Sequence, residues 1–420
     1  MLSDSDMDRI SGLSDEVLIK ILMFVRTKVA VSTSLLSKRW EYLWMWLPKL
    51  EYGDRYSSPS ECKRLECFLD KNLPLHRAPV LESFRLDLSS SYFTPESIKL
   101  WVVIALSHCV RELEVIYDSY PEKPNILPSN LYTCKSLVVL KLDGGILMDV
   151  PRMAFLPSLK TLYLLTVRYF NEESLQRLLS SCPVLEDLSV DFSENDCMGK
   201  PTVVVPSLLS LSLYIPHSFD IDGIVIETPS LTHFKLMDHN NKSHYCLVKN
   251  MPNLIEADID VAFPNIKSLI GSITSVKRLV LCSEAMYDKS FLFNKLKHLK
   301  LCRCNEHSSD LLVRLLKDSS NLQALDLFEM ADHDGNFDMV YWNQPSTVPQ
   351  CILLSLQTLN WSEYAGTPEE RDLAVYILKN AVHLKTTTIS SVEVEVPKFE
   401  MIKELALSPR ASTTCQLVFD

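Results

Sequence analysis

A short leucine pattern recurs along the chain and constrains its fold more than any other feature. Its clearest copy is LKHLKLCRC, from Leu296 to Cys304. Successive side chains of a β-strand point to opposite faces, so Leu299 and Leu301 share one face and Lys300 points outward. Leu296 turns in just before the strand. One such strand cannot bury its apolar side alone, whereas a stack of copies makes a continuous core.

The pattern L-x-x-L-x-L repeats at a nearly regular spacing. The copies begin at Leu81, Val110, Leu137, Leu159, Leu185, Leu208, Leu231, Leu254, Val276, Leu296, Leu322, Leu356 and Leu384. The weakest are the first two, the copy with Ala257 at its second apolar position and the copy with Thr387 there. Most consecutive starts lie in or near the roughly 20 to 29 residues of a leucine-rich repeat, which the pattern resembles.

The segments between the strands predict two kinds of return. Residues 171–181 predict a helix capped by Asn171, and residues 308–320 repeat that design, with leucines at helical spacing in both. Other returns are short and contain proline, such as Val205-Pro206 and Thr228-Pro229, and these predict extended or turn-like chain. We therefore expect an irregular solenoid.

Residues 8–47, the N-terminal block, predict three short helices. In the first, Ser14 is the expected cap, Leu18, Ile21, Leu22 and Val25 form an apolar stripe, and Val17 and Phe24 widen it. A second helix is expected near Lys28 to Leu36. A third, capped by Ser37, presents Trp40, Leu43, Trp44 and Leu47 on one face, and Pro48 ends it. So much apolar surface on so small a block predicts a partner surface, or else a cap on the end of the repeats.

The N-terminal block resembles an F-box of the form common in plants. The matching stretches are DRIS, DEVLIKIL, TKVAVSTSLLSKRW and YLW. One departure is Leu13-Ser14, where the family usually has Leu-Pro. The resemblance implies binding to a Skp-type adaptor, which links the chain to a cullin scaffold. It places near the adaptor interface the residues Leu13, Asp15, Glu16, Val17, Ile21, Leu22, Leu36, Ser37 and Trp40, of which Leu22 and Trp40 are also candidates for the block's own core.

The C-terminal segment changes character. Thr367-Pro368 predicts a helix start with Glu369 and Glu370 in its first turn, a second helix covers about Phe399 to Leu407, and residues 415–419 predict a strand. This segment resembles the FBD region of plant F-box proteins. The residues that carry the resemblance are Trp361, Glu363, Tyr364, Gly366, Tyr376-Ile377-Leu378, Asn380-Ala381, Leu384-Lys385-Thr386 and the closing SPRASTTCQLVFD. We expect it to add two strands and cap the solenoid.

Together these features predict an α/β chain. A small three-helix F-box (residues 1–50) and a connector with one helix (51–80) precede an irregular leucine-rich-repeat solenoid, a horseshoe (81–350). An FBD segment (351–420) caps it. With 420 residues and 47% hydrophobic residues, the chain has ample material for such a core.

Charge and composition restrict the partners. The net charge of −11 argues against general binding to nucleic acid or to an anionic membrane. No apolar run is long enough to span a bilayer, and the start MLSDSDMDRI lacks the features of a signal peptide. We therefore expect an intracellular protein of the nucleus, the cytoplasm or both, with its 12 cysteines as thiols rather than a disulfide framework.

Two clusters raise the question of a metal. Cys302 and Cys304, with His298 and His307 nearby, suggest zinc, but Cys304 occupies a repeat position that favours a small buried group. Residues 332–338 superficially suggest a calcium loop, but the glycine is misplaced and Asn343 stands where a glutamate is needed. We expect no metal and no cofactor at either place.

The sequence favours a receptor over an enzyme. It contains no P-loop, dinucleotide-binding or nucleophile-elbow motif, and its 9 glycines leave little for phosphate-binding loops. By resemblance, we expect a non-catalytic substrate receptor of an SCF-type ubiquitin ligase; the alternatives are a scaffold that assembles no working ligase and, least favoured, a hydrolase. The expected target surface is the outward side of the strands, including Lys141, Tyr163, Ser189, Ser212, Lys235 and Lys300.

Overall fold

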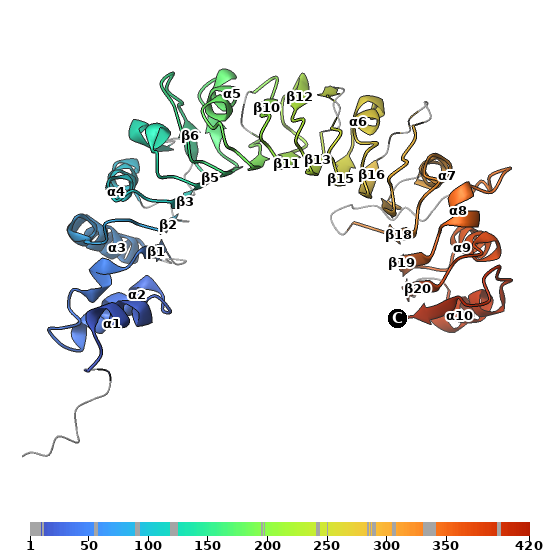
Figure 1. Ribbon diagram of the computed structural model, residues 1–420, viewed down its shortest axis with the longest axis horizontal. Helices are drawn as coiled ribbons and strands as arrows, with labels where there is room; N and C mark the ends of the chain where they lie inside the picture. Colours follow the sequence, from blue (N-terminus) through green and yellow to red (C-terminus); the bar gives the residue numbers. More distant parts are fainter. Residues whose placement is uncertain are drawn as a thin grey trace, which may run out of the picture. The chain divides into compact units, whose positions relative to one another are not determined.

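The computed structural model describes two compact units, Met1–Met198 and Gly199–Asp420. The described residues are 10, 12–53, 58–88, 93–117, 125–194, 196, 198–240, 244–249, 251–283, 285, 287, 291–304, 308–330, 342–392 and 396–420. In each unit, parallel strands line one side and helices or short strands lie behind them (Figure 1). Among the described residues, no helix has the length and apolar character needed to cross a bilayer.

The N-terminal block contains two short α-helices and two 3₁₀ turns. They are α1 (Asp15–Leu22), α2 (Thr27–Ser32), η1 (Thr33–Leu35) and η2 (Leu43–Trp46). The third α-helix predicted from Ser37 is wrong, because turns lead from there into η2. Leu43, Trp44 and Met45 are all buried in η2, and one face of an α-helix cannot hold three consecutive residues. The predicted cap is also wrong in part: Ser14 occupies the N-cap position, but its side chain makes no capping hydrogen bond.

The large sheet of the N-terminal unit consists of parallel strands in the order β1-β2-β3-β5-β7-β9. Their bounds are β1 (Lys49–Gly53), β2 (Ser83–Leu88), β3 (Glu112–Tyr117), β5 (Val139–Gly144), β7 (Thr161–Leu165) and β9 (Asp187–Asp191). Each strand after β1 begins two residues into a predicted copy, and its residues alternate between buried and partly exposed. The repeat prediction is confirmed in this unit. The sequence missed β1, which spans the expected boundary between the F-box and the connector and pairs with β2.

Behind this sheet lie helices and a three-stranded sheet. The elements are α3 (Pro59–Asn72), η3 (Leu73–Leu75), α4 (Pro95–Ser107), η4 (Ser129–Thr133), α5 (Glu173–Ser180), and the strands β4 (Asn125–Ile126), β6 (Ile146–Met148) and β8 (Arg168–Tyr169). The predictions of helices α3 and α5 are confirmed, but the predicted cap of α5 is wrong, because α5 begins at Glu173 and its N-cap position is held by Glu172 rather than by Asn171. Helix α4 was not predicted, although Thr94 caps it through the Ser97 amide and Pro95 occupies its first turn.

The C-terminal unit continues the same design with strands in the order β11-β13-β15-β16-β17-β18-β19-β20-β21. Their bounds are β11 (Ser210–Ile215), β13 (His233–Asp238), β15 (Glu256–Val261), β16 (Arg278–Ser283), β17 (His298–Cys302), β18 (Ala324–Phe328), β19 (Thr358–Tyr364), β20 (Thr386–Ser391) and β21 (Gln416–Phe419). Each predicted copy here forms a strand, including those weakened by Ala257 and Thr387, because both side chains still reach the buried face.

The segments that connect the strands of this unit confirm the prediction that returns containing proline are extended, whereas the return at residues 308–320 is helical. The proline-containing returns form the small sheet β10 (Thr202–Val204), β12 (Gly223–Glu227) and β14 (Tyr245–Val248), whereas α7 (Ser308–Asp318) is the predicted helix. Helices α6 (Lys267–Ser272) and α8 (Gln350–Leu354) were not predicted. Both are short, and their apolar residues are too few to define a helical period.

The C-terminal segment is integrated into this sheet. It contains α9 (Pro368–Asn380) and α10 (Lys398–Leu407), as predicted, and α9 begins with a capping box between Thr367 and Glu370. It contributes three strands, β19, β20 and β21, rather than the two expected, because its two repeat copies and its closing strand all join the sheet. Gly366 precedes α9 with φ +75°, a conformation that favours glycine, and a side chain there would contact Met401.

Candidate docking surfaces

The N-terminal block presents an apolar surface to solvent. Phe24 is 90% exposed, Leu35 is 88% exposed and Leu36 is 69% exposed. In the same block, other large apolar side chains are more than a third exposed; these are Ile10, Val17, Ile21, Met23, Val25, Val29, Tyr42 and Trp46. Single exposed apolar residues are ordinary on soluble proteins, but a concentration of them within one small block marks an interaction site.

The predicted adaptor residues lie mostly on the outside of the block. Asp15, Glu16, Val17, Ile21, Leu36 and Ser37 are exposed, and Leu13 and Trp40 are partly buried. Leu22 is different, because it is only 2% exposed and packs in the core with Leu18. Leu22 therefore takes the second of the two places left open for it, in the core of the block. For the others, the role stays a prediction.

Two residues on this surface were missed as contact candidates. Phe24 was expected only to widen the apolar stripe of the first helix, but α1 ends at Leu22 and Phe24 projects outward. Leu35 lies in η1, immediately after α2, where the helical spacing that orients residues inward no longer applies. The usable signal was the apolar pair Leu35-Leu36, because both members of such a pair cannot face one small core.

An ion pair joins the beginning of the block to its later turns. The Arg39 guanidinium lies 2.9 Å from the Asp15 carboxylate and also donates to the Leu13 carbonyl. Ser14, between those two residues, has φ −71° and ψ 157°. That backbone conformation is one that proline adopts without strain, so the departure from Leu-Pro has not changed the local path.

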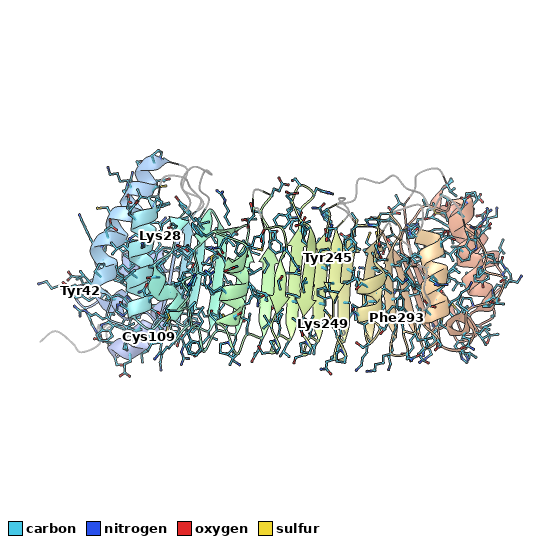
Figure 2. The ribbon with its side chains drawn as sticks, turned by 90° about the horizontal axis from the view of Figure 1, so that it is seen from above. Lys28, Tyr42, Cys109, Tyr245, Lys249 and Phe293 are labelled. Atoms are coloured by element: carbon cyan, nitrogen blue, oxygen red, sulfur yellow. The ribbon has the colours of Figure 1, made fainter. Side chains whose placement is uncertain are left out.

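Hydrogen bonds attach the block to the strands and helices that follow it. The Met45 carbonyl accepts hydrogen bonds from the amides of Arg77 and Ala78, and the Glu51 amide of β1 donates to the Thr27 hydroxyl at 2.9 Å. Figure 2 shows this end of the chain, with Lys28 and Tyr42 labelled in the block. The block is therefore part of the compact N-terminal unit.

In the N-terminal unit, the predicted target residues form one row across neighbouring strands. Lys141 pairs with Tyr163 in register, and Tyr163 pairs with Ser189. The Lys141 ammonium lies 5.3 Å from the centre of the Tyr163 ring, and the Tyr163 hydroxyl donates to Asp187 at 2.9 Å. That hydrogen bond, with burial, raises the pKa of Tyr163. The outward position of these three residues is as expected.

In the C-terminal unit, the other three target candidates also share a row. Ser212 pairs with Lys235, and the row continues through Asp258 and Val280 to Lys300. The Lys235 ammonium lies 4.0 Å from the Asp258 carboxylate, and the Lys300 ammonium lies 4.2 Å from the centre of the Phe328 ring. In both units the alternation that buries the leucines gives the outward positions a polar surface.

The outward side of the N-terminal unit is predominantly acidic. Its acidic side chains are Glu51, Asp87, Glu112, Glu114, Asp143, Asp187 and Asp191, and its basic ones are Lys49, Arg85 and Lys141. Burial, together with the nearby Asp143 carboxylate, raises the pKa of Asp191 to about 6. Burial is the larger cause, and a positively charged partner would offset the smaller contribution from Asp143.

The metal candidates from the sequence are only partly tested. The His298 ring faces Asp326, with Nε2 2.6 Å from the carboxylate, so it does not approach the two cysteines as a ligand. His307 and the residues 332–338 lie outside the described residues. Cys302 and Cys304 do lie close together, and the structure adds Cys282 to them.

Comparison with protein families matches the three parts of the chain in order. An F-box domain model matches residues 10–52, the repeat model "FBD-associated F-box protein At5g56370, LRR repeats" matches residues 98–255, and an FBD model matches residues 344–389. The fold is thus an F-box followed by a leucine-rich-repeat solenoid and an FBD region.

Similar proteins from Arabidopsis thaliana extend over the whole chain. FBD-associated F-box protein At4g10400 is 61% identical, with 98% of this chain and 100% of that protein covered. FBD-associated F-box protein At5g38590 is 52% identical, with 95% and 98% covered, and putative F-box/FBD/LRR-repeat protein At5g62970 is 47% identical, with 98% and 100% covered. The chain belongs to the family of FBD-associated F-box proteins with leucine-rich repeats.

Proposed function

We propose that the chain is the substrate-recognition subunit of an SCF-type ubiquitin ligase. The observation that carries this proposal is the apolar surface of the N-terminal block, centred on Phe24, Leu35 and Leu36. A block that only capped the repeats would need a polar outer face, because terminal units of a solenoid keep the chain soluble. An exposed apolar face on an F-box instead suits a Skp-type adaptor, and through it a cullin scaffold.

The proposed role requires no catalytic group in this chain. The adaptor holds one end, the outward rows of strands hold a target protein, and the assembly brings target lysines near a charged ubiquitin-conjugating enzyme. Holding two reactants in proximity raises their effective concentration by orders of magnitude. Family membership supports the non-catalytic part of this role, because F-box proteins generally serve as adaptor subunits.

The acidic outward side of the N-terminal unit suggests the chemistry of the target. The outward acidic side chains of these strands outnumber the basic ones, although Glu114 already lies 3.4 Å from Arg85 and pairs in register with Lys141. A target with a basic surface would gain complementary charge and faster association there. Binding of that kind weakens as salt rises, so the affinity of a captured target should fall between low and physiological ionic strength.

Co-expression with a plant Skp-type adaptor, followed by size-exclusion chromatography, tests the proposal. Wild type should elute with the adaptor in a one-to-one complex, and Phe24→Asp/Leu36→Asp should lose it. Phe170→Asp is the matched control, because Phe170 is a 62% exposed apolar residue of the same unit but lies outside the block. Loss of binding in the control, or binding unchanged in the double variant, would contradict the proposed docking surface.

The second candidate is a repeat scaffold that assembles no working ligase. Ser14, in place of the usual proline, is the feature that favours it. If wild type stays free of the adaptor and Ser14→Pro restores binding, the scaffold explanation holds. Ubiquitination of a co-purifying protein in a reconstituted assembly would instead support the receptor role.

The proposed receptor role also implies that the chain works inside the cell, in the nucleus or the cytoplasm. Fractionation of cells that express a tagged full-length chain tests this localisation.

A further inference from the structure

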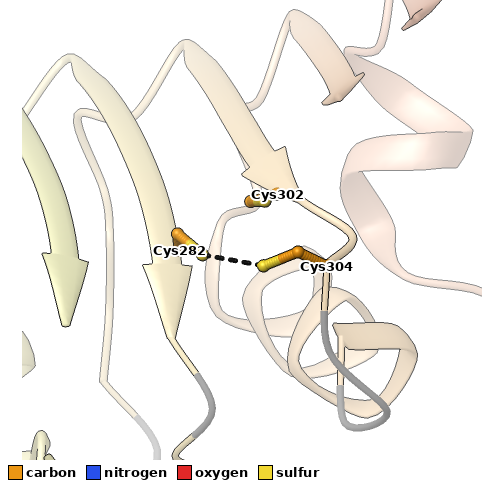
Figure 3. Close-up of side chains that lie close together, drawn as sticks. All are labelled: Cys282, Cys302 and Cys304. Atoms are coloured by element: carbon orange, nitrogen blue, oxygen red, sulfur yellow. Dashed lines mark hydrogen bonds between the residues drawn. The ribbon is translucent and has the colours of Figure 1, made fainter. Parts of the chain in front are cut away.

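Three cysteine side chains converge at the carboxyl ends of two neighbouring strands. Cys282 lies in β16, Cys302 ends β17, and Cys304 follows it by two residues (Figure 3). Their three sulfur atoms lie within 4.8 Å of one another, and those of Cys282 and Cys304 are 3.1 Å apart. Among the described residues this is the one group of three or more His, Cys, Asp or Glu side chains with spacing suited to a metal ion.

The register of the sheet creates this convergence. Leu281 pairs with Leu301, so the next residues, Cys282 and Cys302, lie beside each other on the same face of the two strands. Both thiols are buried, whereas Cys304 is partly exposed. An ordinary repeat position would simply bury a small side chain, which does not explain why Cys304 turns its sulfur toward Cys282 from a partly exposed loop.

Arg303, between two of the cysteines, holds the loop in place. Its buried guanidinium pairs with Glu370 and, at 2.8 Å, with Glu329, and it donates to the Glu363 carbonyl at 3.1 Å. It also lies 5.3 Å from the centre of the Trp361 ring. A residue fixed on so many sides positions its neighbours, so Cys302 and Cys304 are held in place before any ligand arrives.

We propose that Cys282, Cys302 and Cys304 bind one zinc ion. Thiolate sulfur is a preferred ligand of zinc, and a Zn–S distance of about 2.3 Å separates two ligand sulfurs by roughly 3.8 Å in a tetrahedral site. The spread of the three sulfurs is compatible with that geometry after shifts of less than about an ångström. Water completes the tetrahedron, and the thiol protons pass to the solvent, so binding strengthens as pH rises.

Zinc and cobalt binding to the full-length chain tests this site. The chain is reduced, freed of metal with a chelator and titrated with Zn²⁺ against a chromophoric competitor, while Co²⁺ reports sulfur ligation through its thiolate charge-transfer band. We expect one zinc per chain and a band with the intensity of three thiolates. Cys282→Ala, Cys302→Ala and Cys304→Ala should each weaken binding at least tenfold. Cys415→Ser, a partly exposed cysteine of the same unit outside the group, should leave it unchanged.

Several outcomes would overturn the proposal. Equal zinc affinity in wild type and Cys302→Ala would place the metal elsewhere, and a cobalt spectrum without a sulfur band would exclude thiolate ligands. A disulfide between Cys282 and Cys304 in protein prepared without oxidant, with no zinc bound, would make the group a redox pair instead. If the alanine variants do not fold, alkylation of the wild-type chain with and without zinc tests the site instead. Bound zinc must protect these three cysteines from alkylation and leave Cys415 reactive.

Discussion

Replacing Leu35 and Leu36 by alanine removes three carbons from each of two side chains that face solvent. Burying one carbon contributes about 0.8 kcal/mol, so each leucine can lose about 2.4 kcal/mol of docking free energy when it is fully covered. Scaled by exposures of 88% and 69%, the losses are about 2.1 kcal/mol for Leu35 and about 1.7 kcal/mol for Leu36. Together they correspond to a weakening of the adaptor dissociation constant by roughly 600-fold.

The measurement is a titration of the purified Skp-type adaptor against wild type and the double variant by calorimetry or surface plasmon resonance. The thermal midpoint of the free chain should hardly change, because neither side chain belongs to the core. Met153→Ala is the control, since Met153 is also highly exposed in the same unit but lies far along the sequence from the block. A loss of less than about threefold in the double variant would refute the assignment of this surface, as would an equal loss in the control.

Three further predictions concern charge and backbone. Glu370→Gln breaks the buried pair with Arg303 and should lower the free energy of unfolding, measured with urea, by about 3 kcal/mol. The control Glu404→Gln breaks an exposed pair with Arg371 and should lower it by less than about 1 kcal/mol. Similar losses in the two variants would contradict this prediction. Because the pKa of Asp191 is raised to about 6, the folded state binds more protons than the unfolded state between roughly pH 4 and 6, and stability falls as pH rises through that window. Asp191→Asn should reduce that fall in thermal unfolding at pH 4.5 and 7, and an unchanged fall would rule the group out. Ser14→Pro should keep the fold and raise stability by about 0.4–1 kcal/mol, since φ is already −71°; a drop in the unfolding midpoint would show that the preceding backbone cannot accept proline.

The strands were predictable because their signal is local and repeated. Each copy shows its buried residues at a period of two, and even Ala257 and Thr387 reach the core because the neighbouring copies fix their register. The elements that were missed lack this signal. The first strand, around Tyr52, lies outside any copy of the pattern, and its pairing with β2 supplies the order that its own sequence does not.

The candidate sites depend on contacts that the sequence does not display. Cys282 is 20 residues from Cys302, and only the register of two strands brings them together. On the N-terminal block, the sequence pattern failed to predict the orientation of a side chain just beyond the end of a helix. Helical spacing placed Phe24 beside the apolar stripe that contains Leu18 and Leu22, but α1 ends at Leu22, so Phe24 no longer follows the faces of that helix and is exposed. Helical spacing predicts which way a side chain points only for residues that lie within the helix itself.

The attachment of the block bears on how a target could be presented. β1 begins at Lys49, two residues after the buried Leu47, and hydrogen bonds from the amides of Arg77 and Ala78 to the Met45 carbonyl join the block to the segment before β2. A flexible linker would let a bound target sample many orientations, and its effective concentration would fall as the linker lengthened. In this chain the block and the row through Tyr163 belong to one compact unit. A target held on that row would therefore sample fewer orientations relative to a docked adaptor than a flexible linker allows, which suits a receptor whose contribution is position rather than chemistry.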